Sequence, residues 1–214
     1  MKSHPDVIVV TLKSVLFPPL APSPPPRDEL TTFTSYRLNI FGFPVSPALN
    51  GAANLGLLDQ RAAIEWLYSN LAAFGGDPKK MTLFGESAGG SAVNSYAYAY
   101  PHDPLVRGFI MQSGTVEQMH DPGKSEFLRV SAAVGCGDAK DAMKNLQCMK
   151  SVDAKTIQNA VSNLTLNYYA SPSGGYPGVD NVTVFTPAEH EVRGLAGRFA
   201  KLVSSAGDDE GRIY

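Results

Sequence analysis

The stretch MTLFGESAGG, residues 81–90, joins a short apolar run to a glycine-rich turn. The apolar run at residues 81–84 suits a buried strand, and a helix is predicted from Ser87 to about Tyr98. Two prolines end that helix, and residues 108–112 form a second apolar run. A strand, a helix and a strand at this spacing predict a βαβ unit, so the fold class is α/β, with a mostly parallel sheet flanked by helices.

The turn in this stretch, Gly85-Glu86-Ser87-Ala88-Gly89, matches G-x-S-x-G, the pattern of a nucleophile elbow. Ser87 would sit on a sharp, strained turn, and larger residues at Gly85 and Gly89 would collide with the neighbouring backbone. At the start of the helix the macrodipole favours negative charge, and the N–H of Ala88 would point at an oxyanion. The bare pattern is common by chance, but the strand before it and the helix after it favour Ser87 as a nucleophile.

Further elements are predicted upstream of the elbow. A β-branched run at residues 7–11 suits a buried strand, and residues 36–43 form a strand end and a turn. Asn54 is predicted to cap a helix over residues 55–73, which carries an apolar stripe on one face. The sequence FGGDP at residues 74–78 ends that helix.

Downstream of the elbow unit the chain is predicted to be mainly helical. Short helices are expected over residues 124–163. The segment at residues 186–189 has the form of a capping box, with proline at the first helical position. Residues 201–205 are assigned to one more strand, although two serines weaken its pattern.

Residues 13–35 interrupt the succession of predicted strands and helices. They contain six prolines and show neither the period of a strand nor that of a helix. Because proline donates no backbone hydrogen bond and disfavours helix before it, the segment is expected to be extended or disordered. The prediction is a Pro-rich disordered insert at residues 13–35.

Length and composition narrow the class of protein. The 214 residues, 43% hydrophobic and 18% charged, suit one globular domain or part of a larger one. The formal net charge of −2 gives no electrostatic reason to expect nucleic acid as a partner. No run approaches the ~20 apolar residues of a transmembrane helix, and the N-terminus lacks the pattern of a secretory signal peptide. Neither a metal nor a cofactor is expected.

Two cysteines and two sequons indicate the cellular compartment of the protein. Cys136 and Cys148 are either two unrelated thiols or a disulfide that closes a small loop, which would require an oxidising compartment. The sequons at Asn163 and Asn181 are candidate glycosylation sites. Together these residues favour secretion of the full-length form.

Five ordered blocks extend the pattern beyond the elbow. The blocks are YRLNIFGF (36–43), NLGLLDQR (54–61), AAFGGDP (72–78), FGESAGG (84–90) and QSG (112–114). Their succession resembles the type-B carboxylesterase family, which includes cholinesterases and fungal lipases. The resemblance implies a partial α/β-hydrolase domain over residues 1–214 and the hydrolysis of small-molecule or lipid esters.

The resemblance also implies roles for single residues. The family uses Ser, Glu and His in that chain order, and its acid lies in an Asn/Asp-rich stretch that ends in Glu-Gly. Glu210 fits that position as the catalytic acid, with an acidic turn near an exposed terminus as the alternative. Glu86, beside Ser87, also matches the family pattern. There it would tune the electrostatic field of the substrate pocket and would not be a member of the Ser-Glu-His triad. The pair Cys136 and Cys148 resembles a disulfide-closed loop of the family.

Parts of the family pattern are missing. The histidines of the chain are His4, His102, His120 and His190. None of them follows Glu210, where the family has its catalytic base. His102 and His190 are expected at the surface. The glycine-rich loop that supplies the other oxyanion donors of the family, upstream of the strand at residues 7–11, is not present.

Residues 12–35 separate two halves that the family joins directly, with Ser35 in the place of an asparagine. Our hypothesis is that these residues are a translated intron in a truncated gene product. The sequence predicts a serine carboxylic ester hydrolase that acts through an acyl-enzyme, with this chain alone inactive. The alternatives are a non-catalytic cholinesterase-like binding protein and an inactive fragment.

Overall fold

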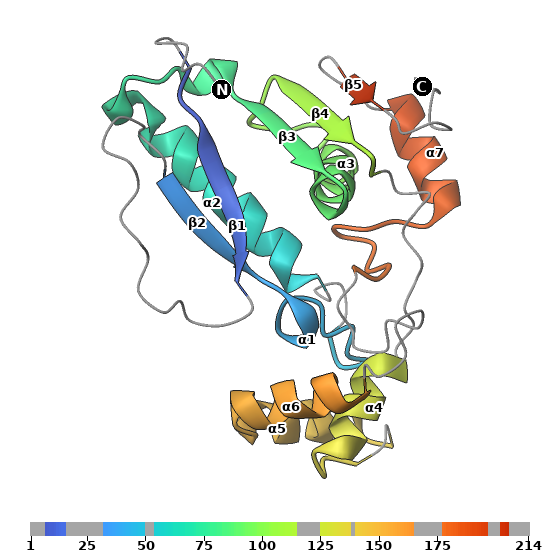
Figure 1. Ribbon diagram of the computed structural model, residues 1–214. Coiled ribbons are helices and arrows are strands. Elements are labelled where there is room, and N and C mark those ends of the chain that lie inside the picture. The colour runs from blue at the N-terminus through green and yellow to red at the C-terminus, as the bar shows by residue number, and fades with distance from the viewer. Residues whose placement is uncertain are drawn as a thin grey trace.

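A parallel sheet of three strands carries the predicted βαβ unit (Figure 1). β3 (Thr82–Glu86) pairs with β4 (Gly108–Gln112), and β4 pairs in turn with β5 (Leu202–Ser205). α3 (Ala88–Ala99) connects β3 to β4 and packs against both strands, so the predicted unit is confirmed. The computed structural model describes residues 7–15, 32–49, 54–114, 125–137, 140–164, 177–196 and 202–205.

Apolar side chains fill the space between α3 and the sheet. Val93, Tyr96 and Ala97 of α3 belong to one buried cluster with Phe109 and Met111 of β4. Close packing on this side leaves α3 little freedom to shift relative to β4. The helix that follows the elbow is therefore fixed in position by its own core contacts.

Two further strands form a separate parallel sheet. β1 (Val10–Val15) pairs with β2 (Thr32–Arg37) over six residue pairs, so β1 begins at Val10 rather than at residue 7. Both ends of the predicted insert at residues 13–35 thus lie in strands, as an extended chain allows. Residues 16–31 lie outside the described residues, and disorder there stays a prediction.

α2 (Leu55–Asn70) carries the predicted apolar stripe. It packs against β2 and α3 and continues into a 3-10 turn, η1 (Leu71–Phe74). Leu57, Ile64 and Leu71 are buried, which confirms the face predicted from the sequence. A second 3-10 turn, η2, leads from α2 towards β3 over Pro78–Lys80.

Asn54 occupies the predicted N-cap position of α2, but its side chain makes no capping hydrogen bond. Its buried amide donates to the Gly178 carbonyl oxygen at 2.8 Å and to the Thr183 hydroxyl at 2.9 Å. Its Oδ1 accepts the Gly178 N–H at 2.9 Å. Because these partners lie 124 and 129 residues further along the chain, no local pattern indicates them.

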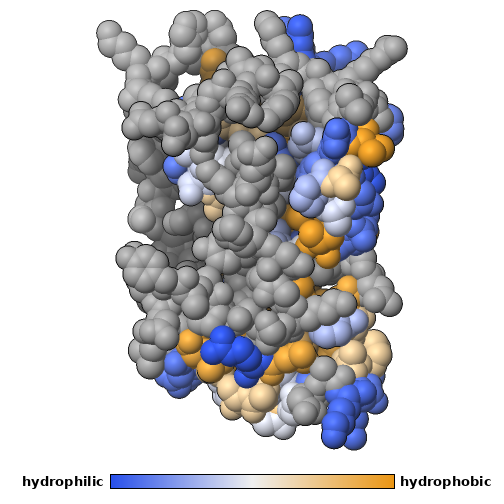
Figure 2. All heavy atoms as spheres, turned by 90° about the vertical axis from the view of Figure 1, so that its right-hand side faces the viewer, coloured by the Kyte–Doolittle hydropathy of each residue, from blue (hydrophilic) through white to orange (hydrophobic). Residues whose placement is uncertain are grey.

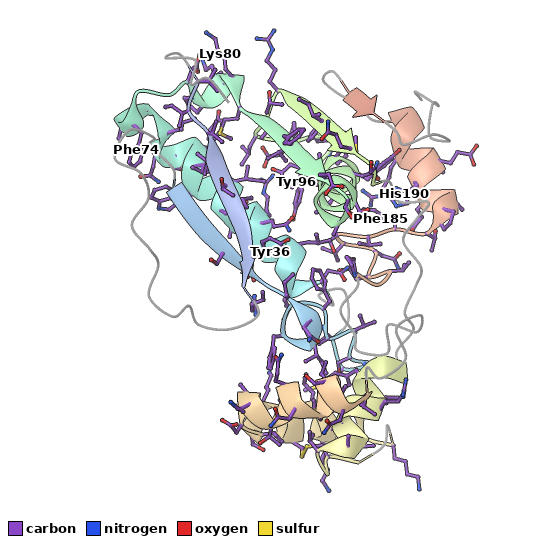
Figure 3. All side chains as sticks on the ribbon, viewed as in Figure 1. Tyr36, Phe74, Lys80, Tyr96, Phe185 and His190 are labelled. Atoms are coloured by element: carbon purple, nitrogen blue, oxygen red, sulfur yellow. A yellow bond between two sulfur atoms is a disulfide. The ribbon has the colours of Figure 1, made fainter. Side chains whose placement is uncertain are left out.

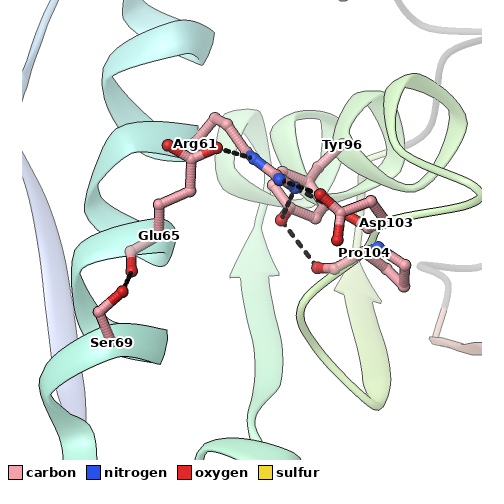
Figure 4. A network of polar contacts seen from close by, with 6 residues as sticks. All are labelled: Arg61, Glu65, Ser69, Tyr96, Asp103 and Pro104. Atoms are coloured by element: carbon pink, nitrogen blue, oxygen red, sulfur yellow. Dashed lines mark hydrogen bonds and ion pairs between the residues drawn. The ribbon is translucent and has the colours of Figure 1, made fainter.

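A network of polar contacts around Arg61 fastens α2 to α3 and to the loop before β4 (Figure 4). The guanidinium donates to the carboxylates of Glu65 and Asp103, each at 2.7 Å, and to the hydroxyl of Tyr96 at 2.9 Å. The Tyr96 hydroxyl donates in turn to the carbonyl oxygen of Pro104 at 2.8 Å. Since the Arg61 side chain is only 10% exposed, the two carboxylates offset the cost of burying its charge.

Three helices form a unit of their own, at the bottom of Figure 1. They are α4 (Ser125–Ala133), α5 (Ala142–Ser151) and α6 (Ala154–Leu164), so the short helices predicted for this part of the chain are confirmed. The unit has its own core, which Ile40 of α1 (Asn39–Gly42) joins. Figure 2 shows hydrophobic and hydrophilic residues mixed over the outer surface of the lower part of the molecule.

A disulfide between Cys136 and Cys148 closes the loop between α4 and α5. The pairing that the family resemblance implied is therefore confirmed. Beside it, the buried amide of Asn145 donates to the Ser131 hydroxyl at 2.6 Å and to the Gly137 carbonyl oxygen at 3.1 Å. The loop is thus held by one covalent bond and by one buried amide.

α7 (Pro187–Ala196) begins with the predicted capping box and packs against α3. The Glu189 N–H donates to the Thr186 hydroxyl oxygen at 3.4 Å, and the Thr186 N–H donates to the Glu189 carboxylate at 3.3 Å. These reciprocal bonds satisfy two backbone donors at the start of the helix and confirm the prediction.

Opening the disulfide should destabilise the chain. With Cys136→Ser and Cys148→Ser combined, the loop between two residues twelve apart is no longer closed in the unfolded state. We expect the free energy of unfolding to fall by about 3 kcal/mol, measured by urea denaturation followed by circular dichroism.

A reducing agent is the control for the disulfide experiment. It should lower the stability of the unmodified chain to that of the double variant and leave the variant unchanged. Equal stability of the oxidised chain and the double variant would show that the bond has no stabilising role.

Candidate active site

Ser87 is an exposed residue at the junction of β3 and α3. Its backbone has φ 53° and ψ −119°. A positive φ is strained for any residue with a side chain, and this combination suits glycine best. β3 ends at Glu86 and α3 begins at Ala88, so the turn predicted by the G-x-S-x-G pattern is concentrated in this single residue.

Backbone contacts hold Ser87 in this conformation. Its N–H donates to the carbonyl oxygen of Gln112 at 2.8 Å, and its own carbonyl oxygen accepts the Ser91 N–H at 3.0 Å. Gly85 lies so close to the first turn of α3 that a Cβ there would overlap the carbonyl oxygen of Gly89. Glycine at position 85 is therefore required by a close approach of backbone to backbone.

Gly89 departs from the prediction that both flanking glycines avoid a collision. A Cβ placed on Gly89 meets no described atom within 4 Å. Gly89 belongs to the first turn of α3, where a side chain would point away from β3. Of the two glycines that flank Ser87 in the motif, Gly85 is therefore required by contacts with described atoms and Gly89 is not.

Ala88 is the first residue of α3 and is exposed beside Ser87. The first N–H groups of a helix have no acceptor within the helix, and the macrodipole places partial positive charge at that end. A backbone donor in this place suits a negative charge that develops next to Ser87. The role of Ala88 in an oxyanion hole stays a prediction.

The two carboxylates singled out in the sequence have different positions. Glu86 is the exposed last residue of β3, opposite Gln112 of β4, and so lies at the carboxyl end of the sheet beside Ser87. Glu210 lies outside the described residues, as do His4 and His120. Its role as the catalytic acid therefore stays a prediction.

The two histidines among the described residues lie near the C-terminal end of α3, away from Ser87. His190 lies on α7 (labelled in Figure 3). It packs edge-on against Tyr98, with ring centroids 4.3 Å apart. His102 follows the C-terminal end of α3. The helix between Ser87 and Tyr98 is about 16 Å long, so neither histidine is placed to accept a proton from Ser87.

His190 is buried, which corrects the expectation of a surface residue. The residue is 8% exposed, and its ring also packs edge-on against Phe185 at a centroid distance of 5.9 Å. Neither ring nitrogen has a hydrogen-bond partner among the described residues. Burial, with a smaller effect of the Arg193 charge, lowers the pKa of His190. The charged residues beside it in the sequence suggested exposure, whereas one of its aromatic partners, Tyr98, comes from α3, far away in the sequence.

Both sequon asparagines are exposed, Asn163 in α6 and Asn181 in a turn at φ 58°. Thr183, the third residue of the second sequon, is buried, and its hydroxyl donates to the Asp180 carboxylate at 2.9 Å. Glycosylation at both asparagines stays a prediction.

Metal sites and membrane-spanning helices are both absent from the described residues. No group of His, Cys, Asp or Glu side chains in this part of the chain has the arrangement of a metal site. None of the helices in the same part is long and apolar enough to cross a bilayer.

Known proteins share this sequence pattern. The model of the carboxylesterase family matches residues 32–206. Chlorogenic acid esterase of Aspergillus niger is 39% identical over 179 residues, which are 82% of this chain and 33% of that protein. Secreted lipase 5 of Gibberella zeae is 35% identical over 185 residues, 81% of this chain and 34% of that protein. Lipase 2 of Diutina rugosa is 33% identical over 204 residues, 84% of this chain and 35% of that protein. The chain spans about a third of the length of the curated relatives it matches.

The Ser87→Gly variant of the chain should be more stable to unfolding than the Ser87→Ala variant. Glycine adopts a φ of 53° without strain, whereas alanine retains the strain of serine. We expect Ser87→Gly to exceed Ser87→Ala in free energy of unfolding by about 1 kcal/mol, although glycine is usually the less stable of the two. Thermal unfolding of both variants measures the difference. A less stable glycine variant would show that residue 87 carries no strain.

The buried imidazole of His190 should make the stability of the chain depend on pH. Because burial lowers its pKa in the folded state, the unfolded chain binds a proton more readily than the folded chain does. The neutral, buried His190 therefore contributes fully to stability above the unfolded-state pKa of about 6.5. The chain loses this contribution as the pH falls below that value.

The measurement is the free energy of unfolding at about pH 7.5 and about pH 5.5, for the unmodified chain and for His190→Gln. The unmodified chain should lose more stability on acidification than the variant does. An equal loss in both would mean that His190 titrates alike in the folded and unfolded states.

Proposed function

The chain belongs to the carboxylesterase family, and on that premise we propose that it is the nucleophile-bearing segment of a serine carboxylic ester hydrolase. Its parallel sheet flanked by helices is a partial α/β-hydrolase fold. The observation that carries the proposal is the exposed Ser87, held at φ 53° between β3 and α3 within the matched residues 32–206. A strained serine at a strand–helix junction is presented to the substrate above the end of the sheet.

The proposed reaction is acyl transfer through Ser87. Its Oγ attacks the ester carbonyl carbon while its proton passes to a histidine, and the carbonyl oxygen becomes an oxyanion. The N–H of Ala88, at the positive end of α3, donates to that oxyanion. The bond to the alcohol then breaks, and the alcohol leaves with the proton held by the histidine. Water that gives its proton to the same histidine attacks the acyl-enzyme, which releases the acid and restores Ser87.

The proposed base comes from outside these 214 residues. His102 and His190 lie at the other end of α3, about 16 Å along the helix from Ser87. No histidine follows Glu210, which is the proposed partner that orients the base. The isolated chain is therefore proposed to lack esterase activity.

The proposed substrates are carboxylic esters of small molecules or lipids. The relatives that support this range are named as a chlorogenic acid esterase and as lipases. Secretion of the whole protein is part of the proposal. It is supported by the disulfide between Cys136 and Cys148, which persists in oxidising compartments, and by relatives named as secreted lipases.

Serine-dependent ester hydrolysis tests the proposed function. In a protein that joins this chain to the flanking coding sequence of its gene, Ser87→Ala should lower kcat/KM for p-nitrophenyl butyrate by at least about 10³-fold. The reason is that no acyl-enzyme forms without the Ser87 hydroxyl. The isolated chain should hydrolyse the same ester no faster than its own Ser87→Ala variant.

Ser69→Ala is the matched control, because Ser69 is an exposed serine on α2 that donates to the Glu65 carbonyl oxygen of the same helix. It should leave kcat/KM unchanged. Activity that survives Ser87→Ala in the longer protein would refute the assigned nucleophile. Serine-dependent turnover by the isolated chain would instead refute the need for an outside histidine.

A further inference from the structure

We propose that Gly114, just beyond the end of β4, is a positioning residue that holds the backbone of Ser87. The inference rests on the proposed function, because it concerns how the nucleophile is held. β3 and β4 are neighbours, with Glu86 opposite Gln112, so the chain leaves both strands at the same edge of the sheet. Gly114 is buried at that edge.

Gly114 packs backbone to backbone against the first turn of α3. A Cβ on Gly114 would overlap the carbonyl oxygen of Ser87 and would lie 2.7 Å from the nitrogen of Ser91. These two atoms form the hydrogen bond that closes the turn, Ser91 N–H to Ser87 oxygen at 3.0 Å. Because both atoms belong to the backbone, neither can move aside unless the turn itself moves.

The same segment also contacts the other side of Ser87. The Gln112 carbonyl oxygen accepts the Ser87 N–H at 2.8 Å. Gly90 permits this approach from the helix side, since a Cβ there would lie 2.8 Å from the Gln112 oxygen and 3.1 Å from the Gly114 oxygen. Residues 112–114 therefore fix the peptide group before Ser87 and the peptide group after it.

Fixing both peptide groups determines the conformation of the nucleophile. The dihedrals φ and ψ of Ser87 lie between those two planar groups and are the only soft backbone rotations available to it. Without that constraint the residue would relax from φ 53° to the negative φ values that serine prefers. Residues 112–114, at and just after the end of β4, supply this constraint. None of them has a role in the proposed reaction.

Thiol reactivity at position 87 tests the inference without any ester hydrolysis. In a Ser87→Cys background, Cys136 and Cys148 remain in their disulfide, so iodoacetamide reacts with the introduced thiol alone. The thiolate sulfur forms a bond to carbon and iodide leaves. A thiol at a helix N-terminus has a lowered pKa, so displacement from that place raises the pKa and slows alkylation at neutral pH.

In that background, Gly114→Ala should slow alkylation by at least about fivefold at neutral pH and move its pH profile to higher pH. Gly108→Ala is the matched control at the opposite end of β4. The three described atoms nearest to a Cβ there all belong to the Thr82 side chain, the first at 3.3 Å, so the rate should change by less than about twofold. Equal rates and pH profiles for the two variants would overturn the inference, whether or not the longer protein hydrolyses esters.

Amide hydrogen exchange in the unmodified chain gives a second measurement and needs no glycine variant. The Ser87 and Ser91 amides should exchange as slowly as the Ile110 amide in the middle of β4. Circular dichroism shows whether Gly114→Ala still folds, and if it does not, the exchange experiment decides. Rapid exchange at Ser87 and Ser91 with slow exchange at Ile110 would contradict the inference.

Discussion

The hydrogen bond from the Ser87 N–H to the Gln112 carbonyl oxygen joins two strand ends at the turn that carries the nucleophile. It requires β3 and β4 to be parallel and in register, and it requires α3 to turn back over β4 at once. The apolar contacts of α3 with β4 keep the helix in that place. The strain at Ser87 is therefore maintained by the packing of the whole βαβ unit rather than by the turn alone.

Much of this arrangement could be predicted from the sequence, because its determinants are local. The glycine-rich turn, the apolar runs around it and the capping box at residues 186–189 each act over a few residues. The side-chain environments of Asn54 and His190 could not be predicted, because Thr183, a partner of Asn54, and Tyr98, a partner of His190, lie far from them in the sequence. Gly89 matches the motif, yet a Cβ placed there would contact no described atom. The motif thus predicts the position of the elbow, but it does not show which of its glycines is sterically required.

The described residues also accord with the proposal that a longer protein carries the activity. Separate core clusters stabilise the helical unit and the βαβ unit, and within the described part of the chain β1 and β2 pair only with each other. β3 pairs with β4 alone among the described strands, and Phe84 on β3 is 62% exposed. Both features accord with the share of the relatives that this chain matches, about a third of each.

Covalent labelling of Ser87 tests the central claim most directly. A fluorophosphonate probe forms a bond between phosphorus and the Oγ of an activated serine and releases fluoride, and mass spectrometry then identifies the modified residue. In the longer protein, the adduct should lie on the peptide that contains Ser87, while the isolated chain should remain unlabelled if, as proposed, the base comes from outside it. An adduct on a different serine of the longer protein, or none at all, would contradict the account.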